Sequence, residues 1–370
     1  KHWLGGRGLN SRILYRETDP TLDPLDPANV LMFSLGPFTG TMVPGSGRVE
    51  VAAKSPVIGI QGMGNMGGYW GPELKYAGYD SIILKGKAAN PVYIAIQNDE
   101  VEIKDAAHLW GLDTYQTQDA IRKELGDPEI EVVCIGPAGE NMIGYASIQT
   151  RMGNAAGRTG MGTVMGSKNL KAIAVRGTKG VAIAKPERFL ELCLEALQVQ
   201  KPQLGMAKTI DLADNDPPSW GLTLGNYEAT EWEKQKELKD GHQPFWESHK
   251  NRQGEGITGC FNCQVRCMDY YELPEWGPLV ASCNLYASTT WVLKDPDMKS
   301  WYAFVSKCQR QGIDSTSASR MMAWAMELYE QGKITQKDTD GIELNWGNKE
   351  AIALMLDKII TKEGFGEVLG

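Results

Sequence analysis

The chain has 370 residues and a formal net charge of −8, from 38 basic and 46 acidic side chains. This length exceeds what one hydrophobic core usually supports, so we expect two domains. The acidic balance argues against a nucleic-acid-binding protein, which must neutralise phosphates. No apolar run reaches the roughly 18 residues that cross a bilayer, so we expect no transmembrane segment.

Residues 1–180 are predicted to form a β-rich domain. Short apolar runs broken by glycine predict strands at 48–53, 81–85, 91–97, 100–104, 131–135 and 171–176. One helix is expected at 113–125, where Asp113 is a suitable N-cap. The chain contains 42 glycines, most of the excess before residue 180, which indicates backbone that approaches a neighbour closely.

Residues 181–370 are predicted to be largely helical. Pro186 suits a first helical turn, and apolar residues then recur at helical spacing. Further helices are expected at 297–311, 316–331 and 348–362, whereas 201–259 reads as irregular connection. The predicted fold class is therefore α+β, with an N-terminal β-sheet domain at 1–180 and a helical domain at 181–370. The chain lacks an initiating Met and stops just after a helix end, so we expect a fragment.

Three cysteines lie within eight residues, in the spacing C-x₂-C-x₃-C: Cys260, Cys263 and Cys267. This spacing is typical of the segment that binds three irons of a cubane iron–sulfur cluster, with a distant cysteine as fourth ligand. A zinc site is the alternative. Seven cysteines in all, with the others scattered singly, indicate reduced thiols and a cytoplasmic protein. We expect Cys134, Cys193 and Cys308 to be small buried apolar residues.

Two glycine-rich segments, 59–71 and 153–166, are predicted to be loops. Their free N–H groups suit a phosphorylated cofactor, and tight packing of sheets is an equally good interpretation. Neither segment fits a Walker or Rossmann phosphate loop, because the lysine spacing and the strand–loop–helix context are wrong. Arg48, Arg151 and Arg158 lie close by and suit phosphates, although a surface position is the alternative for Arg151.

Ordered motifs along the chain resemble one known family. They include Gly36-Pro37-Phe38-Thr39-Gly40, Lys54-Ser55-Pro56, Ile135-Gly136-Pro137-Ala138-Gly139-Glu140 and Met165-Gly166-Ser167-Lys168-Asn169-Leu170-Lys171. In these motifs the chain is similar to the N-terminal two thirds of the aldehyde:ferredoxin oxidoreductase family. The resemblance implies a tungsten–bis-pyranopterin, with molybdenum as the alternative metal, a [4Fe-4S] cluster and magnesium. It also implies oxidation of aldehydes to carboxylates, ferredoxin as electron acceptor, and an oligomer.

The resemblance also implies roles for individual residues. Cys260, Cys263 and Cys267 would bind the cluster, whose fourth ligand would lie beyond Gly370. The backbone carbonyls of Asn65 and Ala155 would bind the magnesium that links the pterin phosphates. Arg48 would lie between cluster and pterin. The remaining residues implied to contact the cofactor are Gly67, Gly68, Gly157, Arg158, Gly160 and Asp314.

Three positions depart from the family pattern. Asn154 stands where an arginine is expected, Ala281 where a carboxylate is expected, and Gln309 where an aspartate is expected. The last two departures, with Cys283 as a possible tungsten ligand, resemble the tungsten subunit of class II benzoyl-CoA reductases. That alternative implies an aryl-CoA substrate and an iron–sulfur partner subunit. A cofactor-free electron-transfer or scaffold paralogue is a further alternative.

Overall fold

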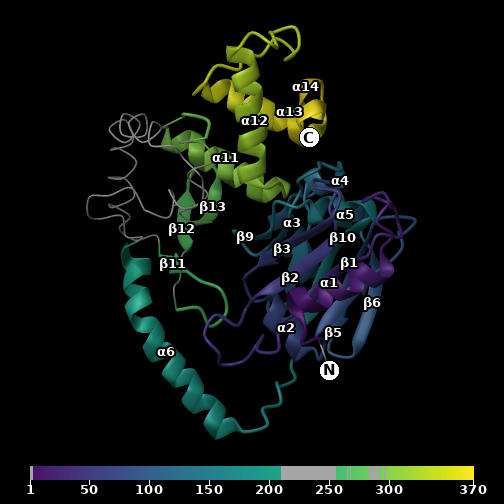
Figure 1. Ribbon diagram of the computed structural model, residues 1–370, viewed down its shortest axis with the longest axis vertical. Coiled ribbons are helices and arrows are strands. Elements are labelled where there is room, and N and C mark those ends of the chain that lie inside the picture. Colours follow the sequence, from purple (N-terminus) through teal and green to yellow (C-terminus); the bar gives the residue numbers. More distant parts are fainter. Residues whose placement is uncertain are drawn as a thin grey trace.

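The computed structural model describes residues 3–209, 256–264, 266, 268–282, 289, 292–295 and 297–370. Figure 1 shows two sheets in the first half of the chain and a group of helices above them. A long helix, α6 (Pro186–Thr209), lies at the lower left of this view, away from the sheets. In the described part, no helix is long and apolar enough to cross a membrane.

The first sheet is antiparallel, with strand order β3-β2-β1-β4. Its strands are β1 (Leu31–Leu35), β2 (Val49–Lys54), β3 (Gln61–Met66) and β4 (Ser81–Leu84). Helix α1 (Gly6–Glu17) covers one face, where Leu14 packs on Met32 and Ala52. The opposite face carries Phe33 and Val51 into the main core.

The second sheet has strand order β6-β5-β10-β7-β8-β9. Its strands are β5 (Val92–Gln97), β6 (Glu100–Asp105), β7 (Glu131–Cys134), β8 (Ile148–Thr150), β9 (Asn154–Ala156) and β10 (Leu170–Arg176). Only β5 and β10 pair in parallel. Trp70, at the start of α2 (Trp70–Tyr76), is fully buried between the sheets and donates to the carbonyl of Ile173 at 3.0 Å.

Helix α3 (Thr114–Leu125) covers the other face of the second sheet. It begins with a capping box between Asp113 and Gln116 and ends at Gly126 in the left-handed conformation. Two short helices, α4 (Pro137–Glu140) and α5 (Met161–Ser167), cross so closely that a Cβ on Gly166 would lie 2.1 Å from the carbonyl oxygen of Gly139. Glycine is therefore required at this crossing.

The second half combines a small sheet with helices. Strands β11 (Ile257–Thr258), β12 (Met268–Leu273) and β13 (Gly277–Ser282) form an antiparallel sheet. The helices are α11 (Met298–Gln311), α12 (Ser315–Glu330), α13 (Lys349–Thr361) and α14 (Phe365–Leu369). The first three begin at side-chain N-caps, Asp297, Asp314 and Asn348, as residues of this kind predict, whereas α14 begins at Gly364.

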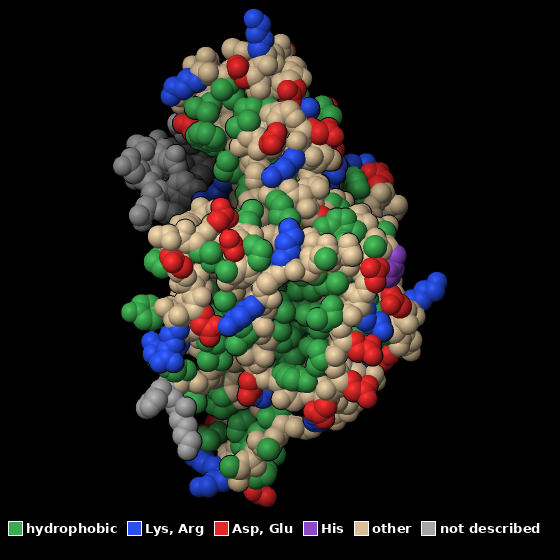
Figure 2. Space-filling view, turned by 90° about the vertical axis from the view of Figure 1, so that its right-hand side faces the viewer, with side chains coloured by type: hydrophobic (Ala, Val, Ile, Leu, Met, Phe, Trp, Pro, Cys, Tyr) green, Lys and Arg blue, Asp and Glu red, His purple; other side chains and the backbone are tan. Residues whose placement is uncertain are grey.

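Some strand residues of the first half expose apolar side chains, on different sides of the sheets: Ile83 pairs with Met32 on the α1 side, whereas Val101 and Ile103 pair with Ile96 and Ile94 on the side of the main core. Ile83 in β4 and Val101 and Ile103 in β6 are exposed although they lie on strands. The space-filling view shows apolar side chains gathered over the sheet region (Figure 2).

The predicted α+β class is confirmed, as are all six predicted strands, the helix at 113–125 and the helices near 297–311, 316–331 and 348–362. The prediction of two glycine loops is wrong, because 59–71 contains β3 and the start of α2, and 153–166 contains β9 and most of α5. The second half is largely helical as predicted and also contains the small sheet β11–β13, which was not predicted. Most of the predicted irregular stretch at 201–259 lies outside the described residues.

Candidate iron–sulfur and cofactor site

The cysteine segment rests on the first sheet domain through backbone hydrogen bonds. The N–H of Phe261 donates to the carbonyl of Gly68 at 3.1 Å, and the N–H of Gly45 donates to the carbonyl of Asn262 at 2.7 Å. The Asn262 amide also donates to the carbonyl of Met42 at 2.8 Å. Three segments distant in sequence therefore meet at the cysteines.

Two glycines make this contact sterically feasible. A Cβ on Gly67 would lie 2.3 Å from Sγ of Cys260, and a Cβ on Gly47 would lie 2.7 Å from the carbonyl oxygen of Gly68. Neither glycine needs a positive φ, so close approach alone explains them. The structure thus brings Gly67, predicted as a cofactor-contacting residue, into contact with a predicted cluster ligand.

The thiols of Cys260 and Cys263 fit the donor set of a cluster. Both are free and partly exposed, and the N–H of Cys263 donates to the carbonyl of Cys260 at 3.1 Å, which closes a tight turn between them. Cys267 and Cys283, the other predicted metal ligands, lie outside the described residues. Among the residues that the structure describes, no three His, Cys, Asp or Glu side chains form a metal-binding group.

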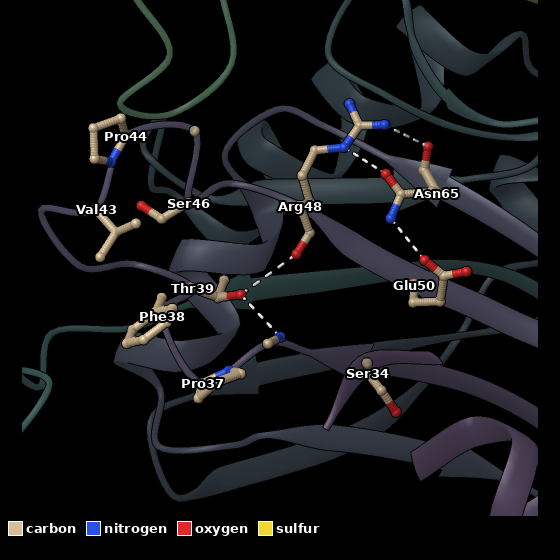
Figure 3. Close-up of a pocket in the computed structure, with 13 residues that line it drawn as sticks. Ser34, Pro37, Phe38, Thr39, Val43, Pro44, Ser46, Arg48, Glu50 and Asn65 are labelled. Carbon is tan, nitrogen blue, oxygen red and sulfur yellow. Dashed lines mark hydrogen bonds between the residues drawn. The ribbon is translucent and has the colours of Figure 1, made fainter. Parts of the chain in front are cut away.

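Arg48 is held by a chain of polar side chains on β2 and β3. Its Nε donates to Oδ1 of Asn65 at 2.5 Å and its Nη2 donates to the backbone oxygen of Asn65 at 3.0 Å. Nδ2 of Asn65 donates to Glu50 at 2.7 Å, and Glu50 also accepts from Arg7 at 3.2 Å. Glu50 is buried and Arg48 is exposed. These hydrogen bonds therefore hold the guanidinium group of Arg48 in place at the surface (Figure 3).

Arg48, Asn65 and Glu50 border a cavity of about 310 Å³. Its opposite wall is the segment 36–46, in which Thr39 links the N–H of Gly36 to the carbonyl of Arg48. The same segment carries the carbonyl of Met42 that holds the cysteine loop. The cavity is therefore next to the candidate cluster site.

In the second glycine-rich segment, 153–166, one glycine lies against another residue predicted to contact the cofactor, and a different glycine is explained by tight packing. A Cβ on Gly157 would lie 2.5 Å from Oδ2 of Asp314, so the structure brings together two residues predicted to contact the cofactor. Gly160 is explained by packing, because its Cβ would lie 2.3 Å from the carbonyl oxygen of Gly144. Ala155 lies in β9, next to Ala156, which packs on Gly64 of β3.

Two charged residues near this segment differ in their contacts. Arg158 is exposed, has a φ of 71° and makes no hydrogen bond or ion pair to any residue that the structure describes. Asp314 caps α12 by accepting from the N–H of Ser317 at 2.7 Å through Oδ1, which leaves Oδ2 facing Gly157. The guanidinium group of Arg158 could therefore bind an anion near segment 153–166.

Arg151 lies apart from these contacts. It forms an ion pair with Glu131, and its guanidinium lies 3.9 Å from the ring centre of Tyr69. Its side chain is 45% exposed, so the surface interpretation of Arg151 describes it better than a phosphate contact.

Gln309 and Ala281, two departures from the family pattern, are buried in structural contacts. Nε2 of Gln309 donates to the carbonyl of Val280 at 2.6 Å, and its Oε1 accepts from the hydroxyl of Tyr115 at 2.7 Å. Ala281 is 2% exposed and belongs to the core of the second half. In this chain neither position supplies an acid or base to the site.

The buried thiols behave as expected. Cys134, Cys193 and Cys308 are all buried. Burial raises the pKa of the Cys134 thiol to about 12 and raises that of Cys308 as well. Cys134 and Cys308 are therefore poor metal ligands, since the thiolate is the form that binds metal.

Glu50, Gly47 and Asn262 were missed by sequence reasoning. Each acts through a contact with a residue distant in sequence: Asn262, for example, bonds to a carbonyl 220 positions away. The only sequence signal was local, since Gly47 precedes Arg48 and Asn262 lies between two cysteines.

Comparison with known proteins was consistent along the whole chain. Residues 1–177 match the family model "aldehyde ferredoxin oxidoreductase, N-terminal domain", and residues 198–370 match "aldehyde ferredoxin oxidoreductase, domains 2 & 3". The tungsten-containing aldehyde ferredoxin oxidoreductase of Pyrococcus furiosus is 37% identical over 100% of this chain and 61% of its own length. The WOR-like subunit of an aliphatic sulfonate oxidoreductase from the same organism is 32% identical, over 100% of this chain and 62% of its own length.

A solved structure is also similar: the active-site complex BamBC of benzoyl coenzyme A reductase in complex with 1,5-dienoyl-CoA. It superposes with a TM-score of 0.86 at 34% identity, over 99% of this chain and 57% of that chain. The chain thus spans about three fifths of the length of the curated relatives it matches. The chain belongs to the aldehyde ferredoxin oxidoreductase family.

Proposed function

We propose that this chain supplies the cofactor base and the iron–sulfur loop of a tungsten–pterin oxidoreductase that oxidises aldehydes to carboxylates with ferredoxin as acceptor. The observation that carries the proposal is the close contact of the Cys260 sulfur with Gly67, beside Arg48, with Cys263 in the same tight turn. When bound, the tungsten–pterin would exchange two electrons with substrate, and the cluster would pass them on one at a time.

The residues have separate roles in this proposal. Cys260, Cys263 and Cys267 hold a [4Fe-4S] cluster, and Cys283 is proposed as a tungsten ligand on the strength of the resemblance to class II benzoyl-CoA reductases. Glycines let the backbone approach the pterin, and Arg158 and Asp314 contact it. The residues in the glycine set are Gly67, Gly68, Gly157 and Gly160.

Magnesium is proposed to bind the carbonyl oxygens of Asn65 and Ala155. The oxygen of Asn65 already accepts a hydrogen bond from Arg48, but a carbonyl has a second lone pair. Arg48 is therefore expected to orient this oxygen and to add positive charge between the cluster and the pterin phosphates.

A second candidate function is reduction of an aromatic acyl-CoA, as the tungsten subunit of a class II benzoyl-CoA reductase with an iron–sulfur partner. The buried Gln309 and Ala281 favour it, because neither offers the carboxylate expected of an aldehyde oxidase. The likeness to the benzoyl coenzyme A reductase complex points the same way. A cofactor-free electron-transfer or scaffold protein is the remaining alternative.

We further propose two domains, 1–180 and 181–370, in a cytoplasmic oligomer. One buried cluster lies between the first two sheets, which supports a first domain. Another joins α11, α12 and α13 and also includes Ala138, Ile143, Tyr145 and Ala146, so the two domains share it as an interface. Free thiols in the described residues suit a reducing compartment.

The intact protein, purified without oxygen, tests the function by metal analysis and by assay with aldehydes and a viologen dye. We expect tungsten, iron and aldehyde turnover. Turnover with aryl-CoA alone would support the second candidate, and iron without tungsten or molybdenum would leave the cofactor-free alternative. Cys260→Ser should lose iron, whereas the matched variant Cys193→Ser, at a buried thiol outside the site, should retain it.

A further inference from the structure

Asn154 contacts the thiol of Cys260. Its Oδ1 lies 3.4 Å from Sγ, within hydrogen-bond distance for sulfur, and the residue is 8% exposed. The backbone of Asn154 is fixed because it pairs with Thr150 across β8 and β9. The side chain also touches the glycine pair: the Cβ position of Gly67 is 3.1 Å from Oδ1, and that of Gly68 is 3.6 Å from Cγ.

The direction of this hydrogen bond depends on the state of the cysteine. A free thiol donates its proton to Oδ1, but a thiolate bound to iron has no proton and can only accept. Rotating the terminal amide by 180° exchanges Oδ1 for Nδ2 at nearly the same place. Nδ2 of Asn154 has no hydrogen-bond partner among the residues that the structure describes, so this rotation breaks no other described bond.

We propose that Asn154 is a positioning residue that donates an N–H to the Cys260 sulfur and thereby raises the reduction potential of the cluster. The inference rests on the proposed function, because it needs a cluster on Cys260. A hydrogen bond to a ligating sulfur stabilises the more electron-rich, reduced cluster. Asparagine makes this contact at a position where the family resemblance led us to expect an arginine.

Two variants separate the effect from a change of shape. Asn154→Leu has a similar size without a donor, and Asn154→Asp keeps the shape while replacing the N–H groups by carboxylate oxygen. In an EPR-monitored redox titration of the intact protein, we expect each variant to shift the ratio of reduced to oxidised cluster at a fixed potential about tenfold toward the oxidised form. That factor corresponds to a potential about 59 mV more negative for one electron.

Asn141→Leu is the matched control. The Asn141 amide donates to the carbonyl of Ile360 at 2.8 Å and makes no described contact with the cysteine loop, so the cluster potential should stay at the wild-type value. An unchanged potential in both Asn154 variants, with the cluster present, would overturn the inference. Absence of the cluster signal from the wild type would overturn the proposed function instead.

The wild-type protein provides an independent measurement. Hyperfine spectroscopy of the reduced cluster uses asparagine labelled with ¹⁵N only at the side-chain amide, because Asn262 lies between two of the cysteines and its backbone nitrogen must stay unlabelled. The spectra should show a coupled amide nitrogen and, on exchange into D₂O, the loss of a coupled exchangeable proton. The absence of both couplings contradicts the inference, even if the variants prove unable to assemble a cluster.

Discussion

Lys168 is a buried ammonium group with only backbone oxygens as hydrogen-bond partners. It is 4% exposed, and its Nζ donates to the carbonyls of Pro27 at 3.0 Å and Gly86 at 3.1 Å. Burial lowers its pKa from 10.5 to about 8. The residue therefore links three segments of the first domain by hydrogen bonds, although burial makes its charged form less favourable than in water.

This pKa makes stability depend on alkaline pH. Between pH 8 and 10.5 the unfolded lysine binds more protons than the folded one, so the free energy of unfolding rises with pH through this interval. Below pH 8 both states are protonated and the charge penalty is constant. We expect wild type to gain about 1–3 kcal/mol relative to Lys168→Met across the interval, as measured by urea unfolding at a series of pH values. Parallel pH profiles of the two proteins would contradict this expectation.

Gly67 provides a second test at the scale of a single residue. Ala at this position would put a Cβ 2.3 Å from Sγ of Cys260, so the cysteine loop must move away from β3. We expect Gly67→Ala to lose most of its iron and its cluster absorption band. Gly180→Ala is the control, because Gly180 has open space around its Cβ position and an ordinary φ; equal iron in both variants would show that the close approach is unimportant.

At the scale of elements, the crossing of α4 and α5 depends on missing side chains. The Cβ position of Gly166 is 2.1 Å from the carbonyl oxygen of Gly139, and that of Gly162 is 2.6 Å from the carbonyl oxygen of Ser147. Backbone cannot give way as a flexible side chain can. The crossing also encloses the buried ion pair of Lys171 with Glu140.

Gly166→Ala should therefore lower the free energy of unfolding by about 2–3 kcal/mol through overpacking. Gly8→Ala on α1 is exposed and meets only Trp3 at an ordinary 3.6 Å, so it should raise stability by about 0.5–1 kcal/mol through helix propensity. Chemical unfolding measures both, and a neutral Gly166→Ala would show that α4 and α5 can separate without cost.

The same elements show where sequence patterns succeed. Strand β5 was predicted because Val92, Ile94 and Ile96 alternate toward the core. Strand β3, with sequence QGMGNM, was missed because it has two glycines and no β-branched residue. It is a strand because it pairs with β2 and because Gly64 admits Ala156 of β9, and neither contact is visible in local sequence.

The candidate site divides in the same way. The cysteines and Arg48 were predicted, because residue type and spacing carry their chemistry. The residues that seat them, such as Asn262 and Glu50, were not predicted, because their partners come from other segments. The importance of these residues depends on tertiary contacts, which local sequence does not show.

At the scale of the whole molecule, Gln309 joins the two halves of the chain. It lies on α11, bonds to β13 through Val280, and bonds to α3 through Tyr115 and through Thr114, whose hydroxyl donates to the Gln309 carbonyl at 2.9 Å. An adjacent ion pair links Arg310 with Asp113 at 3.1 Å. Gln309, where the resemblance led us to expect an aspartate, thus makes a contact between the two halves.

Gln309→Leu should lower the free energy of unfolding by about 2–4 kcal/mol, because the Val280 carbonyl and the Tyr115 hydroxyl lose a buried partner. A double-mutant cycle with Tyr115→Phe should give a coupling of about 1 kcal/mol. Gln331→Leu, at an exposed glutamine bonded only to Glu327, should change stability by less than about 0.5 kcal/mol. Additive effects of the Gln309 and Tyr115 changes would show that the two side chains act separately.

The burial of the thiols has a consequence for chemical labelling. Cys134 and Cys308 are buried with raised pKa values, whereas Cys260 and Cys263 are partly exposed. In folded, metal-free protein, iodoacetamide should alkylate the loop pair within minutes and spare the buried pair. Peptide mass mapping at these four sites would then report metal occupancy and loss of the fold as two separate events.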